Sequence, residues 1–220
     1  MATGDAPVSQ CQKPTGWLGR LNLWRMNVSH SKVTDWGLAH VSIDKQDTIL
    51  DVGCGGGRTV GKLAVMATQG KVYGLDHSEE SVIVTQKTNA RWIESGRVEA
   101  RQGSVAQLPF PGAMFDLVTA VETHFWWPNV PAGMDEIFRV LKAGGKLILI
   151  AEIYRGANTT SARLAEKYAS KTRMKLLSVD EHRALFVNAG FSDVQIIAES
   201  DKAWICGIGR KPNAESLDRR

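Results

Sequence analysis

The segment Thr48-Ile49-Leu50-Asp51-Val52-Gly53-Cys54-Gly55-Gly56-Gly57 decides the fold of this chain. It begins as a short, mostly apolar run, typical of a strand buried in a parallel sheet, and its glycines permit a tight turn into a helix. A second strand is predicted at residues 71–76, ending on Asp76. A carboxylate at that place can accept hydrogen bonds from a ribose. The two features together indicate a ligand that contains a nucleoside.

The spacing of the glycines narrows the class of ligand. A nicotinamide-binding loop follows the pattern GxGxxG, but counting from Gly53 or Gly55 puts Arg58 or Val60 at the third glycine position. A phosphate-binding loop would close with Gly-Lys-Ser/Thr, which is also missing here. The pattern therefore favours a nucleoside ligand without phosphates. A plain tight turn is the structural alternative for these glycines.

Strands and helices alternate along the rest of the chain. Further strands are predicted at residues 97–101, 115–121, 146–151, 194–198 and 203–208, and helices at 58–68, 78–95, 130–142, 158–176 and 178–190. Such alternation implies a parallel sheet with right-handed crossovers and helices on both faces. We therefore expect an α/β fold with a Rossmann-like doubly wound sheet of about seven strands, mostly parallel with an antiparallel last strand, plus an N-terminal helical lid.

Composition limits the other possibilities. The chain has 220 residues, 43% of them hydrophobic, and a net charge of +4, which fits one domain with a real core. No apolar run is long enough for a spanning helix, no secretory signal is visible, and the basic residues form no stripe of the kind that binds nucleic acid. Cys11, Cys54 and Cys206 lack metal-binding spacing. We expect a cytoplasmic monomer or homodimer with no metal, no nucleic-acid partner and no stable membrane insertion.

Several later segments carry a family resemblance in their order and spacing. These are Leu75-Asp76-His77-Ser78, Gly103-Ser104-Val105, Leu108-Pro109-Phe110, Phe115-Asp116-Leu117-Val118 and the stretch from Glu136 to Lys146. With the glycine turn, they make residues 33–209 resemble the class I S-adenosylmethionine-dependent methyltransferases. The similarity is greatest to the small-molecule branch, methyltransferase type 11, which includes quinone-biosynthesis enzymes. The chain departs from the family pattern at Ser104, where an acid is usual, and at Ala143, where proline is usual.

The resemblance implies S-adenosylmethionine as cofactor and divides the chain into three parts. Residues 1–40 would form an arm and helical lid, residues 41–210 the methyltransferase domain, and residues 211–220 a flexible tail. At the methionine end of the cofactor, Asp51 would hold the amine and Gly53 and Gly55 would let the cofactor lie against their backbone. Val121 or Glu122 would offer a backbone carbonyl near the amine.

The resemblance also assigns the nucleoside end of the cofactor. Asp76 would bind the ribose and His77 would pack on the adenine. Ser104 and Val105 would contact the adenine edge through a hydroxyl and a backbone N–H. The serine weakens the expected contact with the adenine amino group, because the usual acid is the better acceptor for it.

The acceptor side is less constrained by the sequence. Glu122 and His124 follow the fourth strand and are candidate general bases, although a lone histidine more often serves as a hydrogen-bonded structural residue. The candidates for the acceptor pocket or lid are Asn27, His30, Trp126, Trp127 and Tyr154. The two tryptophans would form the wall of the pocket or simply pack beneath the N-terminal segment, and the residues around His30 would cover the cofactor or simply start a helix.

These observations predict direct in-line methyl transfer to a small-molecule acceptor. The chain has Glu122-Thr123-His124-Phe125 where nucleic-acid methylators of this fold carry Asn/Asp-Pro-Pro-Tyr/Phe. A metal-assisted catechol mechanism needs grouped carboxylates at the mouth, and the sequence alone does not assemble them. Two alternatives remain: a non-catalytic S-adenosylmethionine-binding protein that acts through an interaction surface on the Trp-rich N-terminal segment, and a nicotinamide oxidoreductase.

Overall fold

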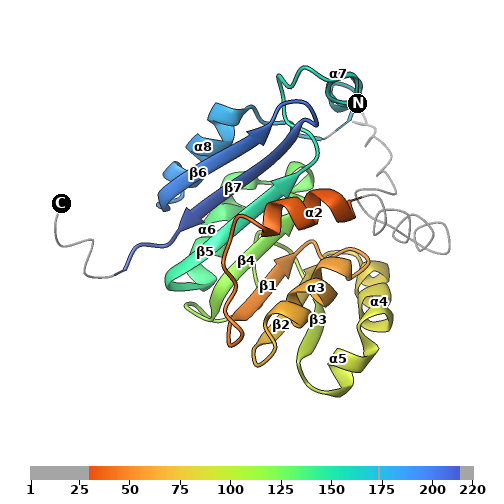
Figure 1. The fold of residues 1–220 in the computed structure, drawn as a ribbon, viewed down its shortest axis with the longest axis vertical. Coiled ribbons are helices and arrows are strands. Elements are labelled where there is room, and N and C mark those ends of the chain that lie inside the picture. The colour runs from red at the N-terminus through yellow and green to blue at the C-terminus, as the bar shows by residue number, and fades with distance from the viewer. Residues whose placement is uncertain (1–29, 173, 214–220) are drawn as a thin grey trace, which may run out of the picture.

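The fold is built on one seven-stranded sheet with helices on both faces (Figure 1). A computed structural model describes residues 30–172 and 174–213. The strands are β1 (Thr48–Val52), β2 (Lys71–Asp76), β3 (Val98–Gln102), β4 (Phe115–Val121), β5 (Leu141–Ala151), β6 (Ser192–Glu199) and β7 (Trp204–Arg210). Their order is β3-β2-β1-β4-β5-β7-β6, and only β7 runs antiparallel to its neighbours. The predicted Rossmann-like sheet is confirmed.

The helices cover the sheet from both sides. They are α2 (Ser31–Leu38), α3 (Arg58–Met66), α4 (Glu79–Thr88), α5 (Ala90–Glu94), α6 (Val130–Val140), α7 (Thr160–Ala169) and α8 (Val179–Asn188), with a short 3-10 helix, η1 (His124–Trp126). One buried cluster joins α2, α3 and α5 to the sheet, and a second joins α6 and α8 to the opposite face. None of the helices in the described parts of the chain is long and apolar enough to span a bilayer.

Three predicted helix bounds were wrong for identifiable reasons. The helix predicted at 78–95 divides at Asn89, whose side chain turns back to donate to the carbonyls of Gly57 and Thr85. The helix predicted at 130–142 ends at Val140, and β5 begins at once, so that Gly144 and Gly145 lie inside a strand rather than stopping a helix. The helical insertion predicted at 158–176 is limited to α7.

The start of α8 and the closing strands are well defined. Ser178 and Glu181 form a capping box at the start of α8: the Ser178 hydroxyl accepts from the Glu181 N–H, and the Glu181 carboxylate accepts from the Ser178 N–H. Strands β6 and β7 form the predicted closing antiparallel pair. Cys206 is buried in β7.

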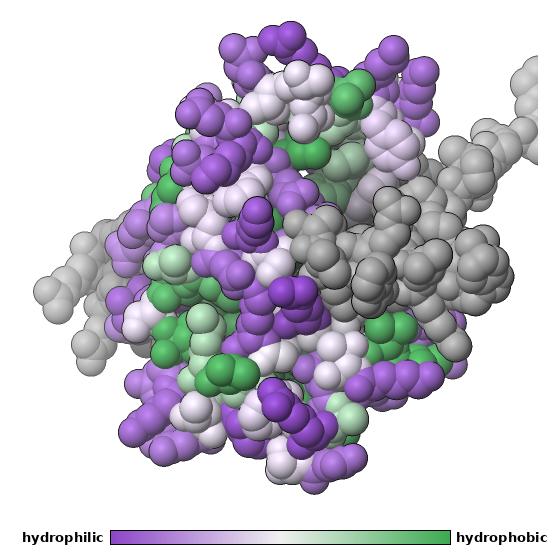
Figure 2. All heavy atoms as spheres, turned by 45° about the vertical axis from the view of Figure 1, so that its right-hand side comes forward, coloured by the Kyte–Doolittle hydropathy of each residue, from purple (hydrophilic) through white to green (hydrophobic). Residues whose placement is uncertain are grey.

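The described surface carries mixed polarity. On the face shown in Figure 2, hydrophobic residues form small areas among hydrophilic ones. The large hydrophobic side chains that are exposed are Val65, Met66, Leu164, Tyr168 and Val187. They come from three different helices, and single exposed apolar residues of this kind are normal for folded proteins. The exposed apolar side chains of the described residues therefore give little guidance to function.

Helix α2 packs closely against the middle of the sheet. Val33 and Leu38 are buried, and Gly37 lies so near β5 that a Cβ atom there would stand 2.4 Å from Ile150 Cδ1 and 2.9 Å from Cγ2. Glycine normally weakens a helix interior, so its presence here reflects close approach to the strand. This contact fixes the position of His30, at the N-terminal end of α2.

We predict that Gly37→Val lowers the free energy of unfolding by about 1–3 kcal/mol, because the new side chain overpacks Ile150. Urea denaturation monitored by circular dichroism would measure the loss. Lys32→Val, at an exposed position on the same helix, is the matched control for the helix propensity of valine. Equal stability of the two variants would show that the contact with β5 is not tight.

Candidate active site

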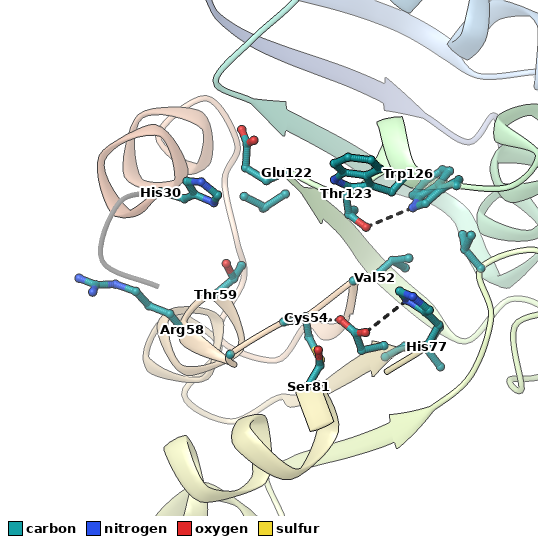
Figure 3. A pocket seen from close by; sticks show the side chains of 18 of the residues that line it. His30, Val52, Cys54, Arg58, Thr59, His77, Ser81, Glu122, Thr123 and Trp126 are labelled. Atoms are coloured by element: carbon teal, nitrogen blue, oxygen red, sulfur yellow. Dashed lines mark hydrogen bonds and ion pairs between the residues drawn. The ribbon is translucent and has the colours of Figure 1, made fainter. Parts of the chain in front are cut away.

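A pocket of about 300 Å³ opens at the carboxyl ends of β1, β2 and β4 (Figure 3). Ligands of doubly wound sheets bind at this edge. The structure brings most of the sequence-predicted residues together there. Those that line the pocket are His30, Gly53, Gly55, Asp76, His77, Ser104, Val105, Val121, Glu122, Trp126 and Trp127.

The glycine turn after β1 forms the floor of the pocket. Gly53, Gly55 and Gly57 all adopt positive φ angles of 74°, 52° and 80°. At Gly53 a Cβ would lie 2.2 Å from Thr123 Oγ1, so a larger residue is excluded by its neighbour as well as by its backbone. The result is a backbone surface free of side chains, against which a ligand can lie.

Asp76 ties this turn to the end of β2. Its Oδ2 accepts from the Gly55 N–H at 3.0 Å and its Oδ1 from the Ser78 N–H at 2.9 Å, while the His77 ring nitrogen Nδ1 lies 3.4 Å from Oδ1. An ionised carboxylate has about four acceptor sites. Two are used by these N–H groups, so capacity remains for ribose hydroxyls on the side that faces the pocket.

The predicted adenine edge lies beside Asp76. Gly103 donates its N–H to the Asp76 carbonyl at 2.9 Å, which places Ser104 and Val105 on the lining. The Ser104 hydroxyl accepts from the Ala106 N–H at 3.2 Å and keeps its own proton free to donate. A serine hydroxyl that donates a hydrogen bond suits a ring nitrogen of adenine, which accepts one. The adenine amino group donates, and an acid would be its better partner.

Asp51 lies behind the pocket rather than on its lining. Only 1% of its surface is exposed, and its Oδ1 accepts from the Thr119 hydroxyl at 2.6 Å. Burial raises the pKa of Asp51 to about 7, although the Thr119 hydrogen bond works in the opposite direction and the Asp76 charge raises it further. The expected contact between Asp51 and the methionine amine stays a prediction. Because Asp51 lies behind the lining, its position favours a contact through a water over a direct one.

Besides Asp51, two predicted residues do not reach the pocket, and one lies outside the described residues. His124 is buried against His182, 1% exposed, and Tyr154 packs in a separate apolar cluster with Phe125 and Ala151. The prediction of His124 as a general base at the pocket, and of Tyr154 as an acceptor contact, is therefore corrected. Asn27 lies outside the described part of the chain.

The His124–His182 pair has a defined protonation pattern. His182 Nδ1 lies 2.7 Å from the Ser178 carbonyl oxygen, which only accepts, so Nδ1 carries the proton. His182 Nε2 is then the acceptor for His124 Nε2, 3.1 Å away. Burial lowers the pKa of both rings, and each ring is held neutral. His124 is thus a structural residue that joins η1 to α8.

The two tryptophans have different roles. Trp127 is almost fully buried, donates its indole N–H to Thr123 Oγ1 at 3.3 Å and packs on Gly133. Trp126 is partly buried and stands at the mouth of the pocket (Figure 3). Trp126 thus faces the cavity, as expected for a wall of the pocket, and Trp127 supports that wall from the core, while the alternative of packing beneath the N-terminal segment concerns residues outside the described part of the chain.

Carboxylates do gather at the mouth, contrary to the expectation from the sequence. Ligand atoms of His30, Glu122 and Glu152 all lie within 4.8 Å of one another. Glu122 follows β4 and Glu152 follows β5, and these strands are parallel neighbours. The sequence places each acid after its own strand, but the spatial order of the strands is what brings them together.

Some lining residues had no sequence prediction. They are Thr34, Arg58, Thr59 and Ser81. Arg58 and Thr59 directly follow the glycine turn, a position that signals exposure to the pocket. Thr34 comes from α2 and Ser81 from α4, and only the three-dimensional arrangement places them on the lining.

The glycine floor, the carboxylate at the end of β2 and the adenine edge define a protein that binds a nucleoside cofactor without a phosphate site. Residues 50–149 match the family model of the methyltransferase domain. The uncharacterized methyltransferase YdaC of Bacillus subtilis is 27% identical over 191 residues, which cover 85% of this chain and 96% of YdaC. The chain belongs to the class I S-adenosylmethionine-dependent methyltransferases. S-adenosylmethionine is its cofactor, and the pocket residues fit it.

Two further comparisons extend the picture. The demethylmenaquinone methyltransferase of Symbiobacterium thermophilum is 37% identical over 105 residues, which span 47% of this chain and 42% of that enzyme. Among solved structures, a chain from the Haloferax volcanii complex of the Trm112 methyltransferase activator with a methyltransferase aligns with a TM-score of 0.77. That alignment covers 95% of this chain and 100% of the other at 19% identity, and it supports the fold.

We predict that acid destabilises the fold through the His124–His182 pair. Because burial lowers the pKa of both rings below the unfolded value of about 6.5, this stability is complete above that pH and is lost as the pH falls below it. Urea denaturation between pH 8 and 5 should show a steeper loss for the wild type than for the double variant His124→Phe/His182→Leu. His40→Gln, which removes an exposed histidine, is the control, and parallel slopes for wild type and double variant would contradict the prediction.

Proposed function

We propose that this enzyme transfers the methyl group of S-adenosylmethionine to a small-molecule acceptor by direct in-line displacement. The observation that carries the proposal is the continuity of one pocket from Asp76 and His77, at the nucleoside end, to Glu122 and Trp126 at the mouth. A cofactor bound along the glycine floor would present its reacting end to that mouth. The volume of about 300 Å³ suits small ligands.

Each residue would contribute by binding and orientation. Asp76 would accept from the ribose hydroxyls, His77 would cover the adenine, and Ser104 and Val105 would contact its edge. The backbone of Gly53 and Gly55, with the Val121 carbonyl, would support the methionine portion, and Asp51 would act on its amine through an intervening water. When bound, S-adenosylmethionine supplies an electrophilic methyl group on a sulfonium.

The chain would accelerate the reaction by positioning and by exclusion of water. Trp126 and His30 stand at the mouth, where an acceptor must enter. Similarity to a quinone methyltransferase supports a small organic acceptor over a macromolecule. A cytoplasmic location and a monomeric or homodimeric state complete the proposal.

A binding protein without catalysis is the competing function, acting through an interaction surface. Calorimetry with S-adenosylmethionine, followed by mass-spectrometric detection of S-adenosylhomocysteine over a panel of amines, phenols, quinols and thiols, separates the two. Cofactor binding together with acceptor-dependent product supports methyl transfer. Cofactor binding without product from any acceptor class would favour the binding protein.

We predict that Asp76→Asn weakens S-adenosylmethionine binding by about 1–3 kcal/mol, because the amide replaces an acceptor with a donor where ribose hydroxyls must be matched. Isothermal titration calorimetry would give the dissociation constant. Asp201→Asn, in the exposed turn between β6 and β7, is the matched control and should bind as the wild type does. If Asp76→Asn leaves the dissociation constant of S-adenosylmethionine unchanged, Asp76 does not bind the ribose.

A further inference from the structure

The carboxyl groups of Glu122 and Glu152 form a pair held by the backbone. The Glu122 N–H donates to the Ile150 carbonyl at 2.9 Å, and the Glu152 N–H donates to Glu122 Oε1. Glu122 also has a positive φ of 56°, so the chain turns sharply as it leaves β4. These constraints direct the Glu122 side chain toward Glu152 and His30 rather than back along the sheet.

Glu122 and His30 line the acceptor end of the pocket, and Glu152, which is not among the lining residues, lies next to both. Figure 3 shows Glu122 and His30 on the same side as Trp126, across the cavity from Cys54, Ser81 and His77. The nucleoside end is occupied by Asp76 and His77. Glu122 and His30 therefore face the place where an acceptor would meet the methyl group.

Little positive charge opposes these two acids within the described residues. His30 Nε2 lies 3.8 Å from Glu152 Oε2 and is the one basic group within ion-pair distance there. Arg58, from the start of α3, and His77, after β2, line the pocket but make no ion pair with either acid. Lys62 of α3 pairs with Asp35 of α2.

The protonation of the cluster follows from its surroundings. Burial, together with the charge of Glu152, raises the pKa of Glu122 to about 8, although the hydrogen bond from the Glu152 N–H works in the opposite direction. Burial also raises the pKa of Glu152 and lowers that of His30. Near neutral pH the pair therefore shares a proton beside a neutral imidazole, and the site as a whole favours a cation.

We propose that this end of the pocket receives a primary or secondary amine as its ammonium ion, and that the Glu122–Glu152 pair, which carries one negative charge, binds the ammonium and takes a proton from it before methyl transfer. The inference rests on the proposed function and names its acceptor class. Glu122 is the contacting group, Glu152 shares its charge, and His30 closes the cluster from α2.

Charge balance favours an amine over a hydroxyl acceptor. An ammonium is attracted by the single negative charge of the carboxyl pair, and it becomes a neutral amine when its N–H bond breaks and the proton passes to the pair. A neutral phenol or alcohol gains no such attraction, and an acceptor that arrives as an anion is repelled by the charge of the pair. The amine nitrogen then bonds to the methyl carbon as the carbon–sulfur bond breaks, and the sulfur keeps that electron pair. The product is a methylated ammonium and a neutral thioether, and the carboxyl pair, which began with one proton, ends with two.

The test uses the full-length protein saturated with S-adenosylhomocysteine and three probes of similar shape: benzylammonium, benzyl alcohol and benzoate. Calorimetry at pH 7.5 should show benzylammonium binding at least roughly tenfold more tightly than the other two. Glu122→Gln and Glu152→Gln should each weaken benzylammonium by roughly tenfold or more, with little change in S-adenosylhomocysteine affinity. Glu94→Gln, an exposed acid at the end of α5, is the matched control.

A second readout separates proton transfer from a structural role. In carbon-13 NMR the Glu122 carboxyl of the wild type should titrate near pH 8, and Glu152→Gln should lower that midpoint because the neighbouring charge is gone. Benzylammonium should lower the midpoint in the wild type. Circular dichroism establishes that each variant is folded, and the two single variants test the same pair independently.

Several results would overturn the inference. They are absent benzylammonium binding, tighter binding of benzyl alcohol or benzoate, unchanged benzylammonium affinity in both variants, and benzylammonium binding that requires Mg²⁺ or Mn²⁺. The last result would identify the cluster as a divalent-cation site instead. The binding of S-adenosylhomocysteine is measured first, so its failure would count against the proposed function and not against the amine class.

Discussion

The contact between the Asp76 carboxylate and the Gly55 N–H is the constraint on which the site depends. It joins the turn after β1 to the end of β2, and the Gly53 and Cys54 N–H groups strengthen the joint by donating to the Leu75 carbonyl. Because Asp76 also accepts from the Ser78 N–H, the same carboxylate sets the start of α4. One buried acid therefore positions the floor of the pocket, the ribose-binding edge and the helix beside them.

The sequence predicted the sheet and the nucleoside end of the site, because both depend on local features of the sequence. Apolar runs, positive-φ glycines and an acid at a strand end are visible without knowing what packs against them. The mouth was harder to predict, because its members come from different segments. Glu122 and Glu152 meet through the adjacency of β4 and β5, and His124 is withdrawn from the pocket by His182, which is 58 residues further on.

Several ionisable groups of this protein lie away from solvent, and their surroundings differ. The Asp51 carboxyl group accepts from the Thr119 hydroxyl, and the two histidines share one hydrogen bond as neutral rings, which leaves His124 Nδ1 without a hydrogen-bond partner among the described residues. Hydrogen bonding and neutrality both limit the cost of burial. Glu122 and Glu152 are the exception in charge: Glu122 accepts the Glu152 N–H, but the nearest charged neighbour of each carboxyl is the other acid, and His30 is the basic group near them among the described residues.

The geometry of Glu122 argues that this exception is functional. A non-glycine residue at a φ of 56° costs about 1 kcal/mol or more, and a second carboxyl within 4.8 Å adds electrostatic repulsion whenever both are ionised. Backbone strain and like-charge repulsion can both be tolerated at a site where a bound ligand offsets one of them. A cation at the mouth of the pocket would offset the repulsion between the two carboxylates. The same acids that destabilise the empty pocket would then hold the acceptor against the methyl group.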